Sequence, residues 1–182
     1  MNFDFEELRI KIEDATRNAF KEIVEKHKEE DIYAFALYSD EGAMTVCPSS
    51  NTQLHLNSIE YDDDLAYYKF TPFEWKYEMQ GADEEFNTIS KSLYNYLLKE
   101  DTDCVDEEFG NFQMRLYNIC IEVLAKLKKE EFFKNILGKD VFLTFEVSDY
   151  EFESDKLKET ITALNDNEYK EEYFNWMKTW GQ

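Results

Sequence analysis

The sequence is poor in the residues from which many ligand sites are built. Its 182 residues include only five glycines, two prolines and two histidines. A phosphate-binding loop needs closely spaced glycines, and the nucleophile turn of many hydrolases needs the pattern G-x-S-x-G; neither pattern occurs. Two histidines also leave little for proton transfer or metal binding. The sequence therefore predicts no nucleotide site, no metal site and no bound cofactor.

Cysteine and long apolar runs are equally scarce. Cys47, Cys104 and Cys120 are an odd number of cysteines at no recognisable spacing, which favours reduced thiols over a disulfide framework. The chain begins with Met1-Asn2-Phe3-Asp4 rather than with a basic segment followed by an apolar one, so no secretion signal is expected. No apolar run approaches the roughly 18 residues that cross a bilayer. We therefore expect a cytoplasmic protein.

Acidic residues outnumber basic residues two to one. The chain has 41 acidic and 20 basic side chains, a formal charge of −21. A field of that sign repels nucleic-acid phosphates and anionic lipids, so we expect neither a nucleic acid nor a membrane as partner. It attracts basic proteins, at a rate that falls as salt rises. Simple solubility explains the same charge equally well.

What the sequence does contain is an apolar and aromatic complement large enough for one folded domain over residues 1–182. Hydrophobic residues make up 43% of the chain, with 15 Phe, 12 Tyr and 3 Trp. Two strands, within 32–38 and 43–47, are predicted to form a central hairpin. Asp40 and Glu41 suit its turn, and Gly42 suits a positive φ there. Alternation places Tyr33, Phe35 and Leu37 on one face of the first strand.

Helical periodicity and a later strand complete the predicted fold. Apolar side chains recur every three or four residues over about 3–27, 86–100, 107–137, 154–164 and 168–180, and Gly138 is placed to end the third of these helices. The alternating side chains of residues 140–148 predict a further strand. Residues 49–64 are expected to be a polar loop over the surface, in which a short helix is an alternative. The pattern predicts an α+β fold, a small and mainly antiparallel sheet covered by several helices.

The sharpest local pattern lies in residues 67–75. Thr71, Pro72 and Glu74 have the spacing of a helix cap, a first helical residue and a capping-box partner, and Phe70 and Trp75 occupy the hydrophobic-staple positions. A helix is therefore predicted from Pro72 to about residue 79. Trp75 should be buried by this arrangement; an exposed Trp75 would instead mark a protein interface.

Three stretches together carry a family resemblance: Y-A-F-A-L-Y with A-M-T-V-C-P and Asn51-Thr52, then Y-K-F-T-P-F-E-W-K-Y-E, then V-S-D ending at Asp149. They resemble the bacterial family catalogued as domain of unknown function 4303. Members often have Arg-Trp before the Ser or Thr where this chain has Lys69-Phe70. The resemblance brings no established activity. In size and acidity, its members are similar to cytosolic immunity proteins that neutralise secreted toxins.

These observations lead to three functional hypotheses. The first is an acidic, immunity-like protein that binds a toxin or another basic protein, and the second is a nucleic-acid mimic that inhibits a DNA-binding protein. The third is a small enzyme, with Cys47, Asn51, Glu74 and Asp149 as the polar residues nearest the predicted strand ends and helix start. A Cys47 nucleophile with His55 as its base is much less favoured than a buried cysteine. The candidate binding residues are Asn51, Thr52, Glu74, Trp75 and Asp149; the oligomeric state stays open.

Overall fold

A central β-sheet with helices on both faces makes up the fold, as a computed structural model shows for residues 3–60, 65–100, 106–148 and 152–180. Its helices are α1 (Phe5–His27), α2 (Gln53–Leu56), α3 (Leu65–Phe70), α4 (Asp83–Glu100), α5 (Asp106–Lys129), α6 (Phe132–Leu137), α7 (Ser154–Leu164) and α8 (Glu168–Met177), with 3-10 turns η1 (Lys28–Glu30) and η3 (Pro72–Glu74). The strands are β1 (Ile32–Asp40), β2 (Val46–Thr52), β3 (Tyr77–Glu78) and β4 (Phe142–Ser148).

The strand order is β3-β2-β1-β4. β1 and β2 form the antiparallel hairpin, β3 adds antiparallel to β2, and β4 lies parallel to β1. The predicted α+β fold with a mainly antiparallel sheet is confirmed, and the later strand does join the hairpin. Within the described ranges, no helix is long and apolar enough to cross a membrane.

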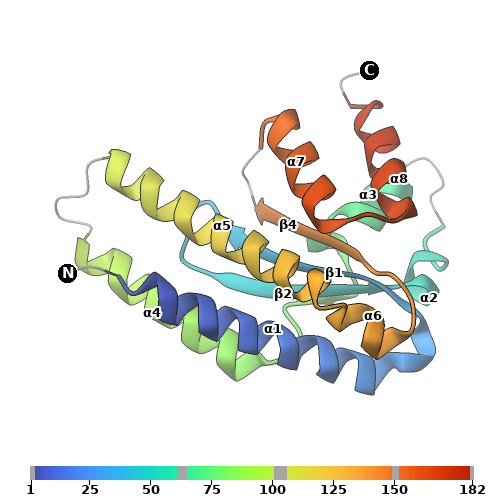
Figure 1. The fold of residues 1–182 in the computed structure, drawn as a ribbon, viewed down its shortest axis with the longest axis horizontal. Coiled ribbons are helices and arrows are strands. Elements are labelled where there is room, and N and C mark those ends of the chain that lie inside the picture. Colours follow the sequence, from blue (N-terminus) through green and yellow to red (C-terminus); the bar gives the residue numbers. More distant parts are fainter. Residues whose placement is uncertain (1–2, 61–64, 101–105, 149–151, 181–182) are drawn as a thin grey trace.

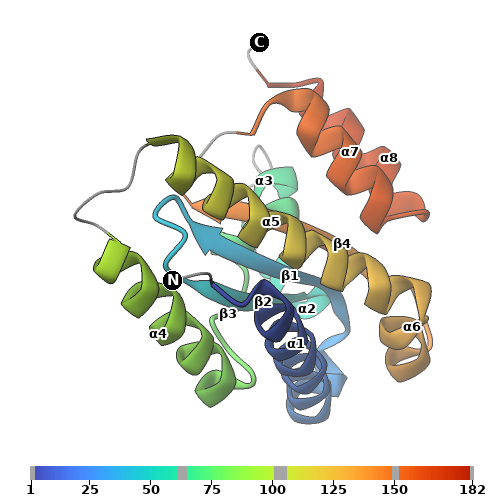
Figure 2. The ribbon, with the colours of Figure 1, turned by 60° about the vertical axis from the view of Figure 1, so that its left-hand side comes forward.

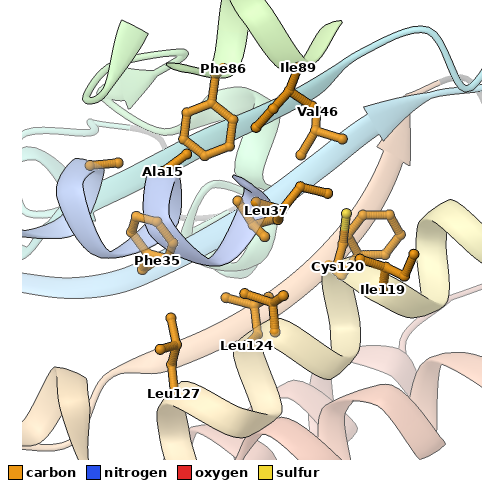
Figure 3. Packing of buried hydrophobic residues seen from close by; sticks show 14 of the residues in the cluster. Ala15, Phe35, Leu37, Val46, Phe86, Ile89, Ile119, Cys120, Leu124 and Leu127 are labelled. Atoms are coloured by element: carbon orange, nitrogen blue, oxygen red, sulfur yellow. The ribbon is translucent and has the colours of Figure 1, made fainter. Parts of the chain in front are cut away.

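The two faces of the sheet have different coverings. On the first face, α1, α4 and α5 bury Phe35, Leu37 and Val46 in the larger hydrophobic core (Figures 1 to 3). On the second face, α3, η3, α7 and α8 cover Ala34 and Ala36 (Figures 1 and 2). These alanines leave room for large rings, and Phe70, Trp75, Phe142 and Tyr173 fill it.

A β-bulge at Tyr33 changes the predicted facing of β1. The pairing runs from Ile32 opposite Thr52 to Ala34 opposite Asn51, so Tyr33 is the extra residue. Tyr33 therefore packs with the second-face core, whereas Phe35 and Leu37 lie in the first. The expectation that these three side chains share a face was wrong, because simple alternation fails across a bulge.

The hairpin differs from the expectation at its turn and at its end. The amide of Ala43 donates to the carbonyl of Asp40 at 2.9 Å, and the positive φ falls on Ala43, not on Gly42. β2 then begins at Val46 and continues through Pro48 to Thr52, so the loop predicted from residue 49 begins with a buried polar strand. The carbonyl of Pro48 accepts the amide of Met79 at 2.9 Å, although proline has no N–H to donate in return.

Two helix predictions were wrong. Residues 72–79 form a single 3-10 turn and then an edge strand, because Trp75 is extended and Tyr77 pairs with Ser50 on β2. The long helix predicted to residue 137 breaks at Glu131, which has a left-handed φ of 54°, and α6 follows. The left-handed Gly138 ends α6, as expected of a C-terminal glycine.

Candidate functional site

Asn51 is completely buried on the second face and acts as an internal connector. Its amide nitrogen donates to the hydroxyl of Tyr33 at 3.1 Å and to the carbonyl of Tyr68 at 3.4 Å. Tyr33 in turn donates to the carbonyl of Lys69 at 2.9 Å. These bonds attach α3 to the bulged strand. The side-chain amide of Asn51 therefore has a structural role in the core.

Thr52 belongs to a second polar network, at the far end of β2. Its hydroxyl accepts the amide of His55, which caps α2, and lies 3.3 Å from Glu30. The hydroxyl of Tyr77 donates to Glu30 at 2.7 Å and lies 2.9 Å from Nδ1 of His27, whose ring stacks on Tyr77. Hydrogen bonds from Lys76 and Tyr77 lower the pKa of Glu30. The network joins α1, β2 and the edge strand β3.

Glu74 and Trp75 lie in different environments: Glu74 is exposed and Trp75 is buried. Thr71 makes no side-chain cap bond, and the carboxylate of the exposed Glu74 instead accepts from Tyr67 at 3.2 Å, so no capping box forms. Trp75 is only 3% exposed, which confirms the predicted burial, and both Trp75 and Phe70 pack on Phe142. The burial comes from the second-face core rather than from a helix staple.

The structure does not bring Cys47, Asn51 and His55 together. Cys47 and Asn51 lie on β2 four residues apart, about 13 Å at the usual strand rise. His55 follows the opposite end of that strand, and Asp149 lies outside the described residues. Burial raises the pKa of the Cys47 thiol, which keeps it from being the thiolate that a nucleophile requires.

A different polar group lies at the carboxyl ends of the parallel strands β1 and β4. Glu146 on β4 is the register neighbour of Tyr38 on β1, which is paired on its other side with Cys47. Tyr38 donates to Glu78 at 2.9 Å, and its ring meets Phe73 edge-on at 5.1 Å. This position is where open α/β sheets commonly place ligands. Sequence reasoning missed Glu146, which alternation treats as an ordinary outward-facing residue.

The carboxyl group of Glu146 is held in an unfavourable environment for a charge. Burial raises its pKa to about 8, with no hydrogen bond or neighbouring cation in the described chain opposing the effect. Part of the side chain nevertheless remains accessible. Burial and the nearby Glu146 also raise the pKa of Tyr173 on α8, and Glu146 contributes to the raised pKa of Tyr67 on α3. Near neutral pH, Glu146 therefore exchanges between its neutral and charged forms.

A surface groove runs between the antiparallel helices α1 and α4. Two adjoining hollows of about 420 and 220 Å³ share Lys11 and Ile89 as lining residues. Their other lining residues are Phe3, Asp4, Glu7, Leu8, Asp14, Glu84, Glu85, Thr88, Ser92 and Tyr96. Five of these lining residues are acidic, and Lys11 is the one basic residue among the lining residues described. Buried Leu8 and Ile89 provide an apolar floor.

A cleft of about 580 Å³ is electrostatically balanced instead. It lies between α5, α6 and the end of α7, and its lysines lie beside carboxylates. Lys128 pairs with Asp166 at 3.4 Å and Lys134 with Asp140 at 3.1 Å. Size alone therefore does not make it the better candidate, because two of its three lysines are already paired within the fold.

A family model matches residues 12–166, most of the chain. This chain belongs to the family described as domain of unknown function DUF4303. The resemblance seen in the sequence is thus confirmed. No curated protein and no solved structure matches the chain.

The segment that matches the DUF4303 model contains most, but not all, of the residues of the two candidate features, the surroundings of Glu146 and the α1–α4 groove. It includes all four strands and therefore Tyr38 and Glu146, and it includes α4 with Glu84 and Glu85. Tyr173 on α8 lies beyond it. Neither feature in this DUF4303 chain presents an activated nucleophile beside a base. Both present carboxyl groups, solvated in the groove and desolvated at Glu146, and carboxyl groups are suited to recognising cations.

Proposed function

We propose that this chain is a cytoplasmic, immunity-like binding protein that neutralises a basic protein partner, and that the partner docks in the groove between α1 and α4. The proposal rests on a difference in ion pairing between the two sides of α1. On its side facing α5, Glu13 is bridged by Arg17 at 2.9 Å and Lys126 at 2.8 Å, and Glu130 also pairs with Arg17. The charges there are matched within the fold.

On the side facing α4, the carboxylates exceed the available cations. Lys11 is already paired with Glu7 at 2.6 Å, and Glu85 accepts the neutral amide of Asn18 at 3.3 Å, with no cation beside it among the described residues. Asp14 and Glu84 line the same hollow. A basic helix or extended segment would place its lysines and arginines against these acids and its apolar side chains on Leu8 and Ile89.

The decisive experiment measures binding of the protein encoded beside this chain's gene. The double variant Glu84→Gln/Glu85→Gln should weaken binding at least tenfold. The control Glu168→Gln/Glu171→Gln removes the same charge from exposed positions on α8 and should change affinity less than twofold. Wild-type affinity should also fall between about 0.05 and 0.5 M salt, where screening shortens from above 10 Å to a few ångströms.

Equal losses in the two double variants would show that overall charge, and not the groove, governs binding. Absence of any complex at low salt would contradict the proposal itself. If double-stranded DNA competed for the partner, with the groove variant abolishing that competition, the protein would act as a nucleic-acid mimic at the partner's DNA-binding surface.

A further inference from the structure

The smaller hollow of the α1–α4 groove is an apolar recess with a fixed aromatic wall. Its volume is about 220 Å³, and buried Leu8 and Ile89 form its floor. The rings of Phe3 and Tyr96 line it and meet edge-on at 4.8 Å. The ring of Phe112 on α5 lies 5.2 Å from each of them. The wall is therefore held in place by the larger core rather than by solvent-exposed side chains alone.

The carboxylates of the two hollows differ in what they contact. In the smaller hollow, Asp4 accepts the amide of Glu7 at 2.9 Å and so caps α1, and Glu7 pairs with Lys11 at 2.6 Å. The larger hollow, of about 420 Å³, has three acids that form no ion pair among the described residues. These three acids are Asp14, Glu84 and Glu85. The groove is therefore apolar at one end and negatively charged at the other.

The spacing of the two hollows favours a helical occupant over an extended one. Ser92 lines the smaller hollow and Glu85 the larger, and seven residues span about 10 Å along α4. Two side chains seven residues apart on a partner helix are separated by the same distance and project from the same face. In an extended segment about 10 Å corresponds to three residues, whose side chains point to opposite faces. One face of a helix can therefore fill both hollows.

Lys11 restricts the residue that lies between these two positions. It lines both hollows, so it lies where they adjoin. A basic side chain in the middle turn of the occupant would be repelled there. The groove thus favours a sequence with an apolar residue, a non-basic residue three or four positions later, and a basic residue at the seventh.

We propose that the groove receives an amphipathic helix of a partner protein, which inserts one leucine or phenylalanine side chain into the smaller hollow. Seven residues away, the helix presents arginine or lysine to the acids of the larger hollow. A recess of about 220 Å³ has room for either apolar side chain, since a cavity of about 150 Å³ holds benzene. This inference rests on the proposed function, because it specifies which segment of the basic partner fills the groove.

The first part of the test uses synthetic peptides and the full chain, at about 0.05 M salt, where surface charges are weakly screened. The in-register peptide is a blocked, stapled helix with one leucine and with two arginines seven and eight residues after it. The shifted peptide has the same composition, with the arginines five and six residues after the leucine and therefore on other faces. Backbone amide NMR signals should report at least tenfold tighter binding of the in-register peptide. Replacing its leucine with alanine should weaken binding at least tenfold.

The second part changes the shape of the groove without changing its charge. Ser92→Trp adds a large side chain in the smaller hollow and should weaken binding of the in-register peptide at least tenfold. The control Asn87→Trp adds the same bulk at an exposed position of α4 that lines neither hollow, and should change binding less than twofold. Both substitutions are at exposed positions, and the alanine peptide tests the same contact on the unaltered chain.

Equal binding of the two peptides, or binding unaffected by Ser92→Trp, would overturn the inference. So would the absence of saturable binding up to about 1 mM in-register peptide. Tighter binding of an extended peptide, with leucine and arginine two residues apart, would identify an extended segment instead. The proposed function would survive any of these results if Glu84→Gln/Glu85→Gln still weakened binding of the protein encoded beside this chain's gene, and would fail separately if it did not.

Discussion

Replacing Glu146 with glutamine should remove a specific part of the pH dependence of folding stability. In the folded chain, burial raises the pKa of Glu146 from its ordinary value of 4.5 to about 8. The neutral form is therefore favoured by folding, and this contribution is fully present below pH 4.5 and lost as pH rises through 8. The difference corresponds to about 3 to 5 kcal/mol of unfolding free energy, the lower end allowing for partial solvent access.

Urea melts at pH 5, 7 and 9 measure the effect as a difference between wild type and Glu146→Gln. The two proteins should differ by less than about 1 kcal/mol at pH 5, where the carboxyl group is neutral and nearly isosteric with the amide. The variant should be the more stable by about 3 to 5 kcal/mol at pH 9. Glu13 and Glu30, whose pKa values are lowered, act in the opposite direction at acid pH but cancel in the difference. Parallel profiles from pH 5 to 9 would refute the burial argument.

Three further substitutions test the packing around the second face and α1. Trp75→Ala should cost about 3 to 5 kcal/mol in a denaturant melt, whereas Trp75→Phe, which removes the unpartnered N–H, should cost less than half as much. Thr71→Val should change stability by less than about 0.5 kcal/mol, because no cap bond is lost; a loss near 1 kcal/mol would indicate a cap after all. Gly81→Ala should cost at least about 2 kcal/mol, since Gly81 has a φ of +99° and a Cβ there would lie 2.9 Å from the backbone of Ala19. The control Gly110→Ala, in open space within α5, should raise the melting temperature.

The elements that could be predicted are those whose pattern is local and repeated. Leu8, Ile12 and Ile23 on α1 mark a helical stripe that tertiary packing only reinforces, and the alternation of Leu143, Phe145 and Val147 marks β4 equally well. The turn of the hairpin was misjudged in detail, because Asp40 binds Met44 and Thr45 through its side chain and shifts the left-handed residue to Ala43. Such competition between side chain and backbone is not visible in residue preferences.

Non-local pairing overrode the strongest local pattern. The segment from Thr71 to Glu74 has the composition of a helix start, yet Tyr77 gains strand pairing with Ser50 and hydrogen bonds to Glu30, which a helix from residue 72 to 79 would forfeit. The buried polar residues of β2 led to a similar error, because polar residues were expected to form a loop. Asn51 looks like a loop residue until the bulge places Tyr33 within reach of its amide.

The missed candidate, Glu146, shows why a site on a sheet is hard to find from sequence. A glutamate in an alternating strand indicates a solvated face, unless a second layer of helices covers that face. The aromatic residues from Tyr67 to Trp75 and from Tyr169 to Trp180 were the available signal, because so many rings require more than one core. Their number is consistent with a second layer, but it does not identify the carboxyl group that this layer encloses.

Salt should act mainly on the association of a basic partner with the groove between α1 and α4. Carboxylates in this open groove interact through water, so their attraction is weakened within a Debye length. Charges that attract a partner from a distance steer its approach, and screening removes this steering. Raising the salt concentration should therefore slow association far more than it speeds dissociation.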